Sequence, residues 1–257
     1  MTAPKIRAMK QKGGKVTCVT AYDISSATLC DLAGVDVILV GDSVGNVVLG
    51  METTLPVTMA DMIHHTMAAR KGIHRALLVA DLPFGSYQAS VERAVESAIA
   101  LVKAGAEAVK LEGPYTEQIS AIVRAGIPVM GHVGMTPQSV NNFGGFKVQG
   151  KGDDAEAVIA AARAVDEAGA FAMVLELVPA GLAAQITDRV SCPTIGIGAG
   201  PRCDGQVQVF HDMLGLSEER FRHVKAYAEG RKVFIEALQQ YVQEVRDSKF
   251  PGNEHSV

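Results

Sequence analysis

The sequence has no apolar run approaching the roughly 20 residues that a membrane-spanning helix needs. Its first 15 residues, MTAPKIRAMKQKGGK, are polar and basic and lack the apolar stretch of a secretory signal. We therefore expect a protein of the cytoplasm that does not bind membranes.

The sequence also lacks runs of lysine and arginine, and its net charge over 257 residues is −4. Because nucleic-acid binding depends strongly on clustered cationic side chains, we expect no nucleic-acid partner. There are only four cysteines, with neither a CxxC pair nor a metal-binding spacing: Cys18, Cys30, Cys192 and Cys203. In a chain of this size they indicate reduced thiols in the core or in loops, which agrees with a cytoplasmic location.

What the sequence does contain is a repeated unit. An Ala-rich helical stretch is followed by an Ala-Gly stop and then by a short run of Val, Ile and Leu, as in ALVKAG before AEAVKLEG and AIVRAG before IPVMGHVG. The glycines of four such units fit the position just after a helix, where a positive φ is needed: Gly34, Gly105, Gly126 and Gly169. The runs that follow are apolar without strict alternation, which is typical of strands covered by helices on both faces.

This pattern predicts an α/β fold, a (β/α)8 TIM barrel, because the chain length is also that of such barrels. An open doubly wound sheet is the alternative. The eight strands are expected at 16–23, 36–42, 76–83, 107–113, 128–134, 171–178, 193–199 and 205–210. Helices are expected at 58–71, which opens with a Thr58–Asp61 capping box, at 93–103, at 154–168, and as a pair within 217–246. We expect a single domain over 1–257, with C-terminal helices and the short tail FPGNEHSV at the surface.

Ionisable side chains occur at the ends of six of the expected strands. They are Asp23, Asp42, Asp81, Lys110 with Glu112, His132 and Glu176. In a parallel barrel the active site lies at the carboxyl ends of the strands, and charges buried there are costly unless they are paired or bind a metal. The pattern therefore predicts an enzyme. A non-catalytic binding barrel, the alternative from another class, would show no dependence on a metal.

Three carboxylates follow one another on successive strand ends: Asp42, Asp81 and Glu112. Placed together they would repel one another unless a cation lay between them. An all-oxygen set of ligands suits Mg²⁺ or a similar hard cation better than Zn²⁺. The alternative is that each carboxylate caps a helix or closes a turn, which is plausible for one of them but not for all three.

The other strand-end residues each have two interpretations. Lys110 shares a face with Glu112, so it could hold a substrate carboxylate or form a structural ion pair. Glu176 ends an apolar run and could be a general base or a cap before Pro179. His132 could donate to a substrate oxygen or be a satisfied core histidine.

At these strand ends the sequence resembles the ketopantoate hydroxymethyltransferase family. The matching stretches run in order along nearly the whole chain, and the long segment at 131–152 is the most specific. They are TAYD (20–23), LVGDSVGNVVLG (39–50), TTLPVTMADM (53–62), LLVADLPFGSY (77–87), VKLEG (109–113), GHVGMTPQSVNNFGGFKVQGKG (131–152), LELVP (175–179), IGIGAGPRCDGQVQVFHDMLG (195–215) and FPGNEHS (250–256). One departure is Met51-Glu52, where the family often has a His-Asp pair outside the metal site.

The resemblance implies a set of roles. Mg²⁺ would be bound by Asp42, Asp81 and Glu112, and the oxo-acid substrate by Asp42, Ser43, Asp81 and Lys110, with Glu176 as the catalytic base. The implied reaction condenses 3-methyl-2-oxobutanoate with the one-carbon unit of 5,10-methylenetetrahydrofolate, on the way to pantothenate and coenzyme A. The resemblance also implies a homo-oligomer, often a decamer.

The nearest alternative is a Mg²⁺-dependent lyase or mutase of the phosphoenolpyruvate mutase/isocitrate lyase kind. Such an enzyme also uses carboxylates at a barrel rim around an oxo acid. It would be expected to carry a reactive cysteine in a loop, and the KVQGKG region has none.

Overall fold

The computed structural model describes residues 1–219 and 221–257, and its first part is a closed barrel of eight parallel strands. The strands pair in sequence order, and β8 pairs with β1 to close the barrel. They are β1 (Val16–Thr20), β2 (Val37–Val40), β3 (Leu77–Asp81), β4 (Ala108–Lys110), β5 (Val129–Gly134), β6 (Ala172–Glu176), β7 (Thr194–Ile197) and β8 (Gly205–Gln208). The predicted (β/α)8 barrel is confirmed, and the doubly wound sheet is excluded.

The observed strands lie within the predicted ranges but are shorter. The prediction of 107–113, for example, becomes Ala108–Lys110, because the backbone leaves the sheet before Glu112. The chain beyond each strand still runs along the carboxyl end of the barrel, as the backbone N–H of Gly113 donates to the His132 carbonyl at 2.8 Å. Polar residues just past the strands therefore remain at that end.

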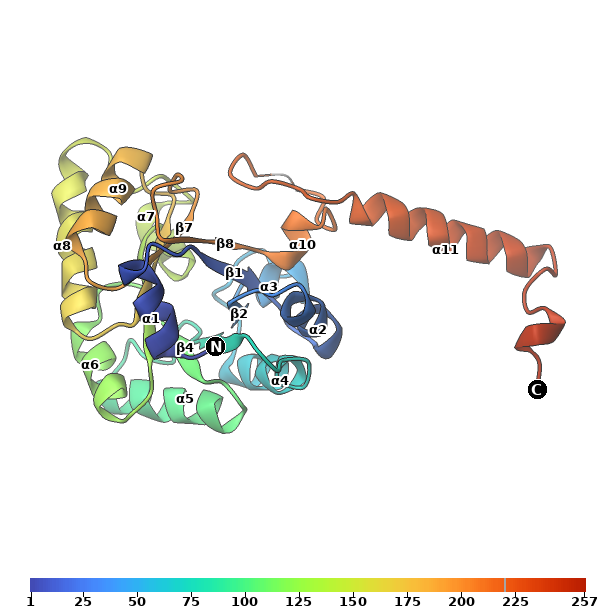
Figure 1. Ribbon diagram of the computed structural model, residues 1–257, viewed down its shortest axis with the longest axis horizontal. Coiled ribbons are helices and arrows are strands. Elements are labelled where there is room, and N and C mark those ends of the chain that lie inside the picture. Colours follow the sequence, from blue (N-terminus) through green and yellow to red (C-terminus); the bar gives the residue numbers. More distant parts are fainter. Residues whose placement is uncertain (220) are drawn as a thin grey trace. The chain divides into compact units, whose positions relative to one another are not determined.

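Helices form an outer layer around the strands (Figure 1). They are α2 (Ile24–Leu32), α4 (Met59–Arg70), α5 (Val91–Lys103), α6 (Thr116–Arg124), α8 (Ala155–Glu167) and α9 (Ala180–Arg189). The predicted capping box of Thr58 and Asp61 is present at the start of α4. The four Ala-Gly stops have positive φ, between 86° at Gly34 and 114° at Gly105, so these glycines end helices as predicted.

Short helical turns lie in the connections that follow β2 and β5. They are α3 (Val44–Val47), η1 (Pro137–Ser139), α7 (Val140–Phe143) and η2 (Gly152–Asp154). The turn η1 is important for the site, because it brings Gln138 back over the strand ends, where this side chain is buried.

The helix α1 (Ala3–Gln11) precedes the barrel and contributes Ala3 and Ile6 to its core. Ile6 is fully buried against barrel residues such as Val16 and Ile195. These two residues are near the first residues of β1 and β7, so α1 packs at the end of the barrel opposite to the strand ends considered above. The polar N-terminal sequence gave no sign of this helix.

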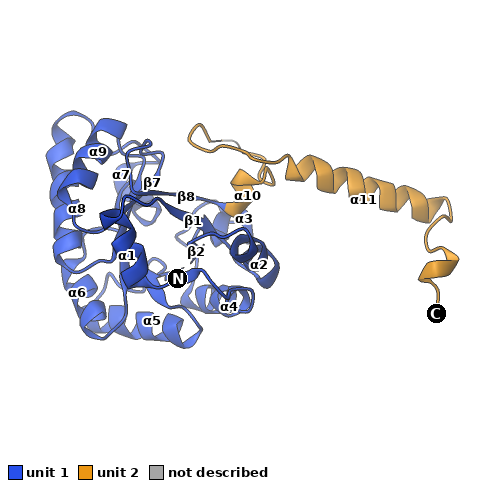
Figure 2. Cartoon of the chain, viewed as in Figure 1, with its two compact units in different colours: residues 1–209 blue, residues 210–257 orange. Residues whose placement is uncertain are grey.

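The chain divides into two compact units, residues 1–209 and 210–257 (Figure 2). The second contains α10 (Phe210–Met213), α11 (Gly230–Arg246) and the turn η3 (Asn253–His255). The prediction of two helices within 217–246 is wrong, because the only helix between 221 and 246 starts at Gly230. Whether both units form a single domain stays a prediction. Within the described residues, no helix combines the length and apolar character required to cross a membrane.

Candidate active site

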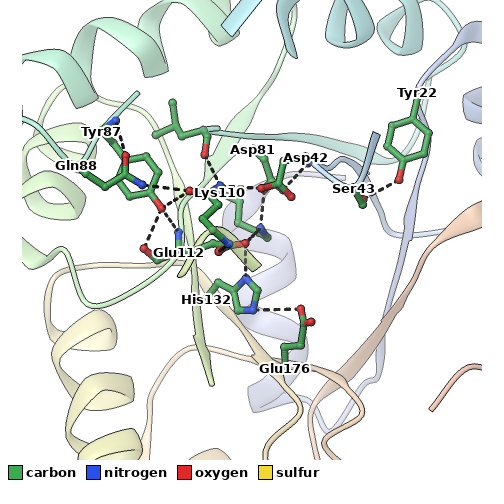
Figure 3. A network of polar contacts seen from close by, with 12 residues as sticks. Tyr22, Asp42, Ser43, Asp81, Tyr87, Gln88, Lys110, Glu112, His132 and Glu176 are labelled. Atoms are coloured by element: carbon green, nitrogen blue, oxygen red, sulfur yellow. Dashed lines mark hydrogen bonds and ion pairs between the residues drawn. The ribbon is translucent and has the colours of Figure 1, made fainter. Parts of the chain in front are cut away.

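Ionisable side chains from five successive strands meet at the carboxyl end of the barrel (Figure 3). Asp42 follows β2, Asp81 ends β3, Lys110 ends β4 with Glu112 two residues later, His132 lies in β5, and Glu176 ends β6. All are buried except Glu176, whose side chain is 18% exposed. The structure thus brings together the residues that the sequence pattern selected at these five strands.

Lys110 lies beside two of the carboxylates. Its Nζ lies 2.8 Å from Asp81 Oδ1 and 3.9 Å from Glu112 Oε1. The other oxygen of Asp81, Oδ2, accepts a hydrogen bond of 3.0 Å from the backbone N–H of Asp42. The ends of β2, β3 and β4 are therefore joined through polar atoms rather than through packing alone.

His132 lies between two carboxylates. Its Nδ1 is 3.4 Å from Glu112 Oε1 and its Nε2 is 3.4 Å from Glu176 Oε2. Both ring nitrogens are buried, and in the described chain neither has a well-formed hydrogen bond. His132 is therefore not a satisfied core histidine: it links the cluster around Lys110 to the more accessible Glu176.

Gln138 belongs to the same cluster, and sequence reasoning missed it. Its side-chain Nε2 donates to Asp42 Oδ2 at 2.8 Å, and its backbone N–H donates to Glu112 Oε2 at 2.9 Å. The hydroxyl of Tyr87 lies 2.7 Å from its Oε1. A glutamine in a TPQS loop segment carries no local signal of such a position, because Asp42 is 96 residues away in the sequence.

The end of β1 differs from the prediction. Asp23 was expected at the rim, but it is exposed and caps α2 by accepting from the backbone N–H of Ser26 at 2.8 Å. This is the ordinary role of an aspartate before a helix. The residue before it, Tyr22, is buried and its hydroxyl lies 2.8 Å from Ser43 Oγ, so the strand contributes a phenol rather than a carboxylate.

Burial and mutual repulsion determine the protonation of the cluster. Burial raises the pKa of Asp42 to about 8, and the charges of Glu112 and Asp81 add to the effect. Burial also raises the pKa of Asp81, although Lys110 opposes it. Burial acts on Glu112 as well, but the contact with His132 outweighs it and holds the pKa of Glu112 below its usual value.

The two cations of the cluster are both charged at neutral pH. Burial disfavours the charged imidazole of His132, yet Glu112 and then Glu176 raise its pKa to about 9. Lys110 is likewise buried, but Asp81 and Glu112 raise its pKa above the usual value. These two cations pair with Asp81, Glu112 and Glu176, so Asp42 is the carboxylate of the cluster with which neither of them forms an ion pair.

The residues fit a hard divalent cation by their chemistry. They offer carboxylate oxygens, Asp42 lacks a compensating charge, and Asp81 Oδ1 accepts no well-formed hydrogen bond despite its ion pair with Lys110. Over residues 1–219 and 221–257, no three His, Cys, Asp or Glu side chains stand close enough to hold a metal by themselves. An ion here would therefore complete its shell with water or substrate oxygens, as Mg²⁺ usually does.

The four cysteines are free and buried, as predicted. Burial raises the pKa of Cys30 to about 11 and that of Cys192 still further, so these thiols are protonated and unreactive. Cys18 lies in the barrel core, where burial and the charge of Asp81 also raise its pKa. None of them supplies a nucleophile to the site.

A parallel (β/α)8 barrel with such a charged cluster at the carboxyl ends of its strands defines a TIM-barrel enzyme whose chemistry acts on a small polar substrate. The sequence pattern of the ketopantoate hydroxymethyltransferase family matches residues 1–253. The chain belongs to this family. The resemblance predicted from the strand-end motifs is confirmed, and the hydroxymethyltransferase is favoured over the lyase or mutase alternative.

Relatives with the name of this enzyme family match the chain over its full length. A 3-methyl-2-oxobutanoate hydroxymethyltransferase of Moorella thermoacetica is 56% identical over 100% of this chain and 97% of its own length. Proteins of the same name from Syntrophus aciditrophicus and Chloroflexus aurantiacus are 55% and 53% identical, each over 100% of this chain, and are themselves covered over 96% and 92%.

Solved structures share the fold at low sequence identity. A phosphonopyruvate hydrolase in complex with oxalate and Mg²⁺ has a TM-score of 0.63 at 15% identity, covering 99% of this chain and 93% of its own. A 2,3-dimethylmalate lyase of the PEP mutase/isocitrate lyase superfamily has a TM-score of 0.62 at 17% identity, covering 99% and 91%. The alternative predicted from the sequence therefore shares the architecture of this chain.

Proposed function

We propose that this enzyme transfers a hydroxymethyl group to 3-methyl-2-oxobutanoate and forms 2-dehydropantoate. The co-substrate is 5,10-methylenetetrahydrofolate; its methylene carbon and one water become the hydroxymethyl group, and tetrahydrofolate leaves. The observation that carries the proposal is the buried cluster of Asp42, Asp81 and Glu112 around Lys110, in a chain of this family.

Asp42, Asp81 and Glu112 would hold Mg²⁺ in this proposal. When bound, the ion would act as a Lewis acid toward the keto oxygen and carboxylate of the oxo acid. The donor chemistry supports this assignment, and so does the raised pKa of Asp42, because burial and the neighbouring carboxylates disfavour its charged form until a cation binds beside it. Asp42 and Asp81, with Ser43, would also contact the substrate.

Lys110 and His132 are the cationic groups that would face the substrate. Lys110 lies at the centre of the carboxylates, where a fixed ammonium stabilises negative charge that develops on a bound oxo acid. His132 could donate to a substrate oxygen, and its position beside Glu176 would also fix the orientation of that carboxylate.

Glu176 would be the general base that removes the proton from C3 of the oxo acid. It is the most accessible carboxylate of the cluster and has His132 beside it. The carbanion at C3 would then attack the methylene carbon of the folate in its iminium form: the new carbon–carbon bond forms as the C=N π electrons move onto the folate nitrogen. Water would then replace that nitrogen at the methylene carbon, so that the C–N bond breaks, the hydroxyl group forms and tetrahydrofolate leaves with the water's other proton. A base at this place needs no cysteine, in agreement with the four buried thiols.

We further propose that the protein assembles into a homo-oligomer in the cytoplasm, with a decamer as the expected state. Support for assembly comes from α11, where no residue is buried and a row of large apolar side chains is exposed: Phe234, Leu238, Tyr241 and Val245. Faces of this kind commonly mark protein contacts. Light scattering coupled to gel filtration measures the subunit number directly.

The experiment that tests the proposed reaction has two stages. The enzyme, Mg²⁺ and 3-methyl-2-oxobutanoate are first incubated in D₂O, where we expect deuterium to enter at C3 and to stop when EDTA is added. Methylenetetrahydrofolate is then included, and mass spectrometry should detect 2-dehydropantoate. Deuterium exchange without product would exclude the transferase while leaving the metal-dependent deprotonation, and the absence of both would reject the proposal.

A further inference from the structure

Gln138 contacts three neighbouring strand ends at once. Its Nε2 donates to Asp42 Oδ2 after β2 and to the carbonyl of Leu82 after β3, at 2.8 Å and 3.0 Å. Its backbone N–H donates to Glu112 Oε2 after β4 at 2.9 Å. These are the three strand ends that carry the carboxylates of the cluster, and Gln138 itself is only 5% exposed.

The orientation of the Gln138 amide is fixed by its surroundings. Its Nε2 faces two acceptors, the carboxylate of Asp42 and the Leu82 carbonyl, so both of its protons are used. Its Oε1 faces the hydroxyl of Tyr87 at 2.7 Å and Nε2 of Gln88 at 3.2 Å. A flipped amide would set an oxygen against two oxygens and an NH₂ against another NH₂.

The Tyr87 hydroxyl has a definite direction as well. The backbone N–H of Glu112 donates to this hydroxyl at 3.2 Å, which leaves its single proton for an acceptor. Two oxygens are in reach, Gln138 Oε1 at 2.7 Å and the Glu112 carbonyl at 3.1 Å, and the shorter contact is to Gln138. A directed chain therefore runs from the Glu112 N–H through Tyr87 to Gln138 and on to Asp42.

The consequence for the carboxylates is that each has one oxygen held by an uncharged N–H. Gln138 holds Oδ2 of Asp42 and Oε2 of Glu112, and the backbone of Asp42 holds Oδ2 of Asp81. The second oxygens of Asp81 and Glu112 face Lys110, and Oδ1 of Asp42 is not contacted by Gln138. The three neighbouring carboxyl groups are thereby kept in one orientation.

We propose that Gln138 is a positioning residue that orients Asp42 and Glu112 for their ligand, and that the Tyr87 hydroxyl sets the direction of its amide. The ligand is the one of the proposed function, a divalent cation together with an oxo acid, so this inference rests on that proposal. Tyr87 and Gln138 would contact neither ligand and would act only through the carboxylates.

The first test compares Tyr87→Phe with Tyr115→Phe. The rings of Tyr87 and Tyr115 contact each other edge to face at 5.3 Å, but the described contacts place only the hydroxyl of Tyr87 in the hydrogen-bonded chain. Calorimetry with Mg²⁺ and 3-methyl-2-oxobutanoate should show binding weakened by about threefold to tenfold in Tyr87→Phe, the effect of one lost buried hydrogen bond. Tyr115→Phe should bind as the wild type does.

The second test uses Gln138→Met, which removes the amide but keeps the backbone N–H to Glu112 and fills a similar volume. We expect Mg²⁺-dependent affinity for the oxo acid to fall by at least about tenfold, because Asp42 and Leu82 both lose a donor. If Tyr87 acts through the Gln138 amide, the double variant will bind no more weakly than Gln138→Met alone, whereas independent effects would multiply.

Thermal unfolding distinguishes the proposed positioning role from a purely structural role. The ligand-free midpoint reports the general stability of each variant, and the increase of the midpoint with Mg²⁺ and oxo acid reports binding. The proposal expects the ligand-induced increase to shrink in Tyr87→Phe and Gln138→Met but not in Tyr115→Phe. Affinities within about twofold of wild type in both variants would overturn the positioning role of Gln138 but would leave the proposed function standing. A wild-type protein without Mg²⁺-dependent oxo-acid binding would contradict the proposed function and this inference together.

Discussion

Glu176 differs from the other acidic residues of the cluster in its exposure. Its side chain is 18% exposed, whereas those of Asp81 and Glu112 are 2% exposed and are engaged by Lys110 or by backbone N–H groups. A carboxylate that must exchange a proton with a substrate needs such access. This difference, rather than the number of carboxylates, supports the proposal that Glu176 is the base.

The variant Glu176→Gln should therefore separate binding from proton removal. It keeps the volume and a polar contact to His132 but has no base, so C3 deuterium exchange should fall by at least about a hundredfold. Binding of Mg²⁺ and 3-methyl-2-oxobutanoate, measured by calorimetry, should stay close to wild type. C3 deuterium exchange at the wild-type rate would show that Glu176 is not the base.

Sequence reasoning identified the charged residues of the site better than the neutral ones. Asp42, Asp81, Lys110, Glu112, His132 and Glu176 could be found because an ionisable side chain at the end of an apolar strand is conspicuous. Gln138 and Tyr87 could not, since their importance depends on partners in distant parts of the chain. Asp23 was misplaced because a carboxylate after a strand is equally suited to cap the next helix.

At the scale of elements, β5 and β6 approach each other closely at Glu176, the proposed base. Gly134, the last residue of β5, has φ of +96° and pairs with Glu176. A Cβ on Gly134 would collide with the Glu176 carbonyl oxygen and with a methyl group of Val178. Leu177, the residue after Glu176, also has a positive φ of 46°. Its N–H donates to the Ile197 carbonyl of β7 at 2.9 Å.

We expect Gly134→Ala to destabilise the protein by more than about 1 kcal/mol, because it combines backbone strain with a collision. Urea unfolding measures the loss, and C3 deuterium exchange should fall with it because Glu176 moves. The matched control is Gly181→Ala in α9, where no atom lies near the added methyl group and helix propensity favours alanine. Equal stability of the two variants would contradict this account of β5.

A second connection between elements depends on Asp31 in α2. Its carboxylate accepts hydrogen bonds from the backbone N–H groups of residues 74–76, just before β3, at 2.8–3.2 Å. Although burial favours the neutral acid, these donors hold the pKa of Asp31 below its usual value. The carboxylate therefore stabilises the folded state above the unfolded-state pKa of about 4, and this stability is lost as the pH falls through the folded-state pKa.

The variant Asp31→Asn should lose about 1–3 kcal/mol of unfolding free energy at pH 7 in urea titrations. The difference from wild type should shrink below about pH 4, where the aspartate becomes protonated. Asp188→Asn, at an exposed position of α9, is the control and should change little. A difference that does not depend on pH would assign the loss to geometry instead of charge.

The succession of elements was largely predictable, and their ends were less so. Ala-Gly stops before apolar runs located four of the eight strands, and the short apolar runs themselves indicated the other four, since a helix end and a buried strand each leave a local pattern. The strand 107–113 was predicted too long because the pattern of apolar and strand-end polar residues continues through Leu111 and Glu112, although the sheet ends at Lys110. The composition of 217–246 indicated two helices, yet the described residues 217–219 and 221–229 form no helix.

The whole barrel separates its functional end from an end that serves stability. The ionisable cluster lies at the carboxyl ends of β2 to β6, while α1 packs near the first residues of the strands. Lys10 of α1 contacts Asp204 at 3.0 Å and donates to the Thr187 carbonyl at 2.6 Å, and Arg7 donates to Ser191 Oγ at 2.8 Å. Changes in α1 should therefore affect unfolding and leave the chemistry intact.

Ile6→Ala tests this separation. Ile6 is fully buried, so the truncation should cost about 2–5 kcal/mol of unfolding free energy. The turnover of folded enzyme at low temperature should stay near wild type, because the site is at the other end of the barrel. Lys5→Ala, at an exposed position of the same helix, is the control for helix propensity. Loss of turnover in Ile6→Ala without loss of stability would contradict the separation.

The attachments of α1 also constrain the order in which a growing chain can complete its fold. Of the helices described here, α1 is the first to be synthesised, yet its polar partners are residues 187–204 and the β1 strand behind it must wait for β8. On a ribosome these early residues remain without their polar partners until residues 187–204 of the 257 have been translated. Their polar, lysine-rich character keeps them compatible with water during that interval.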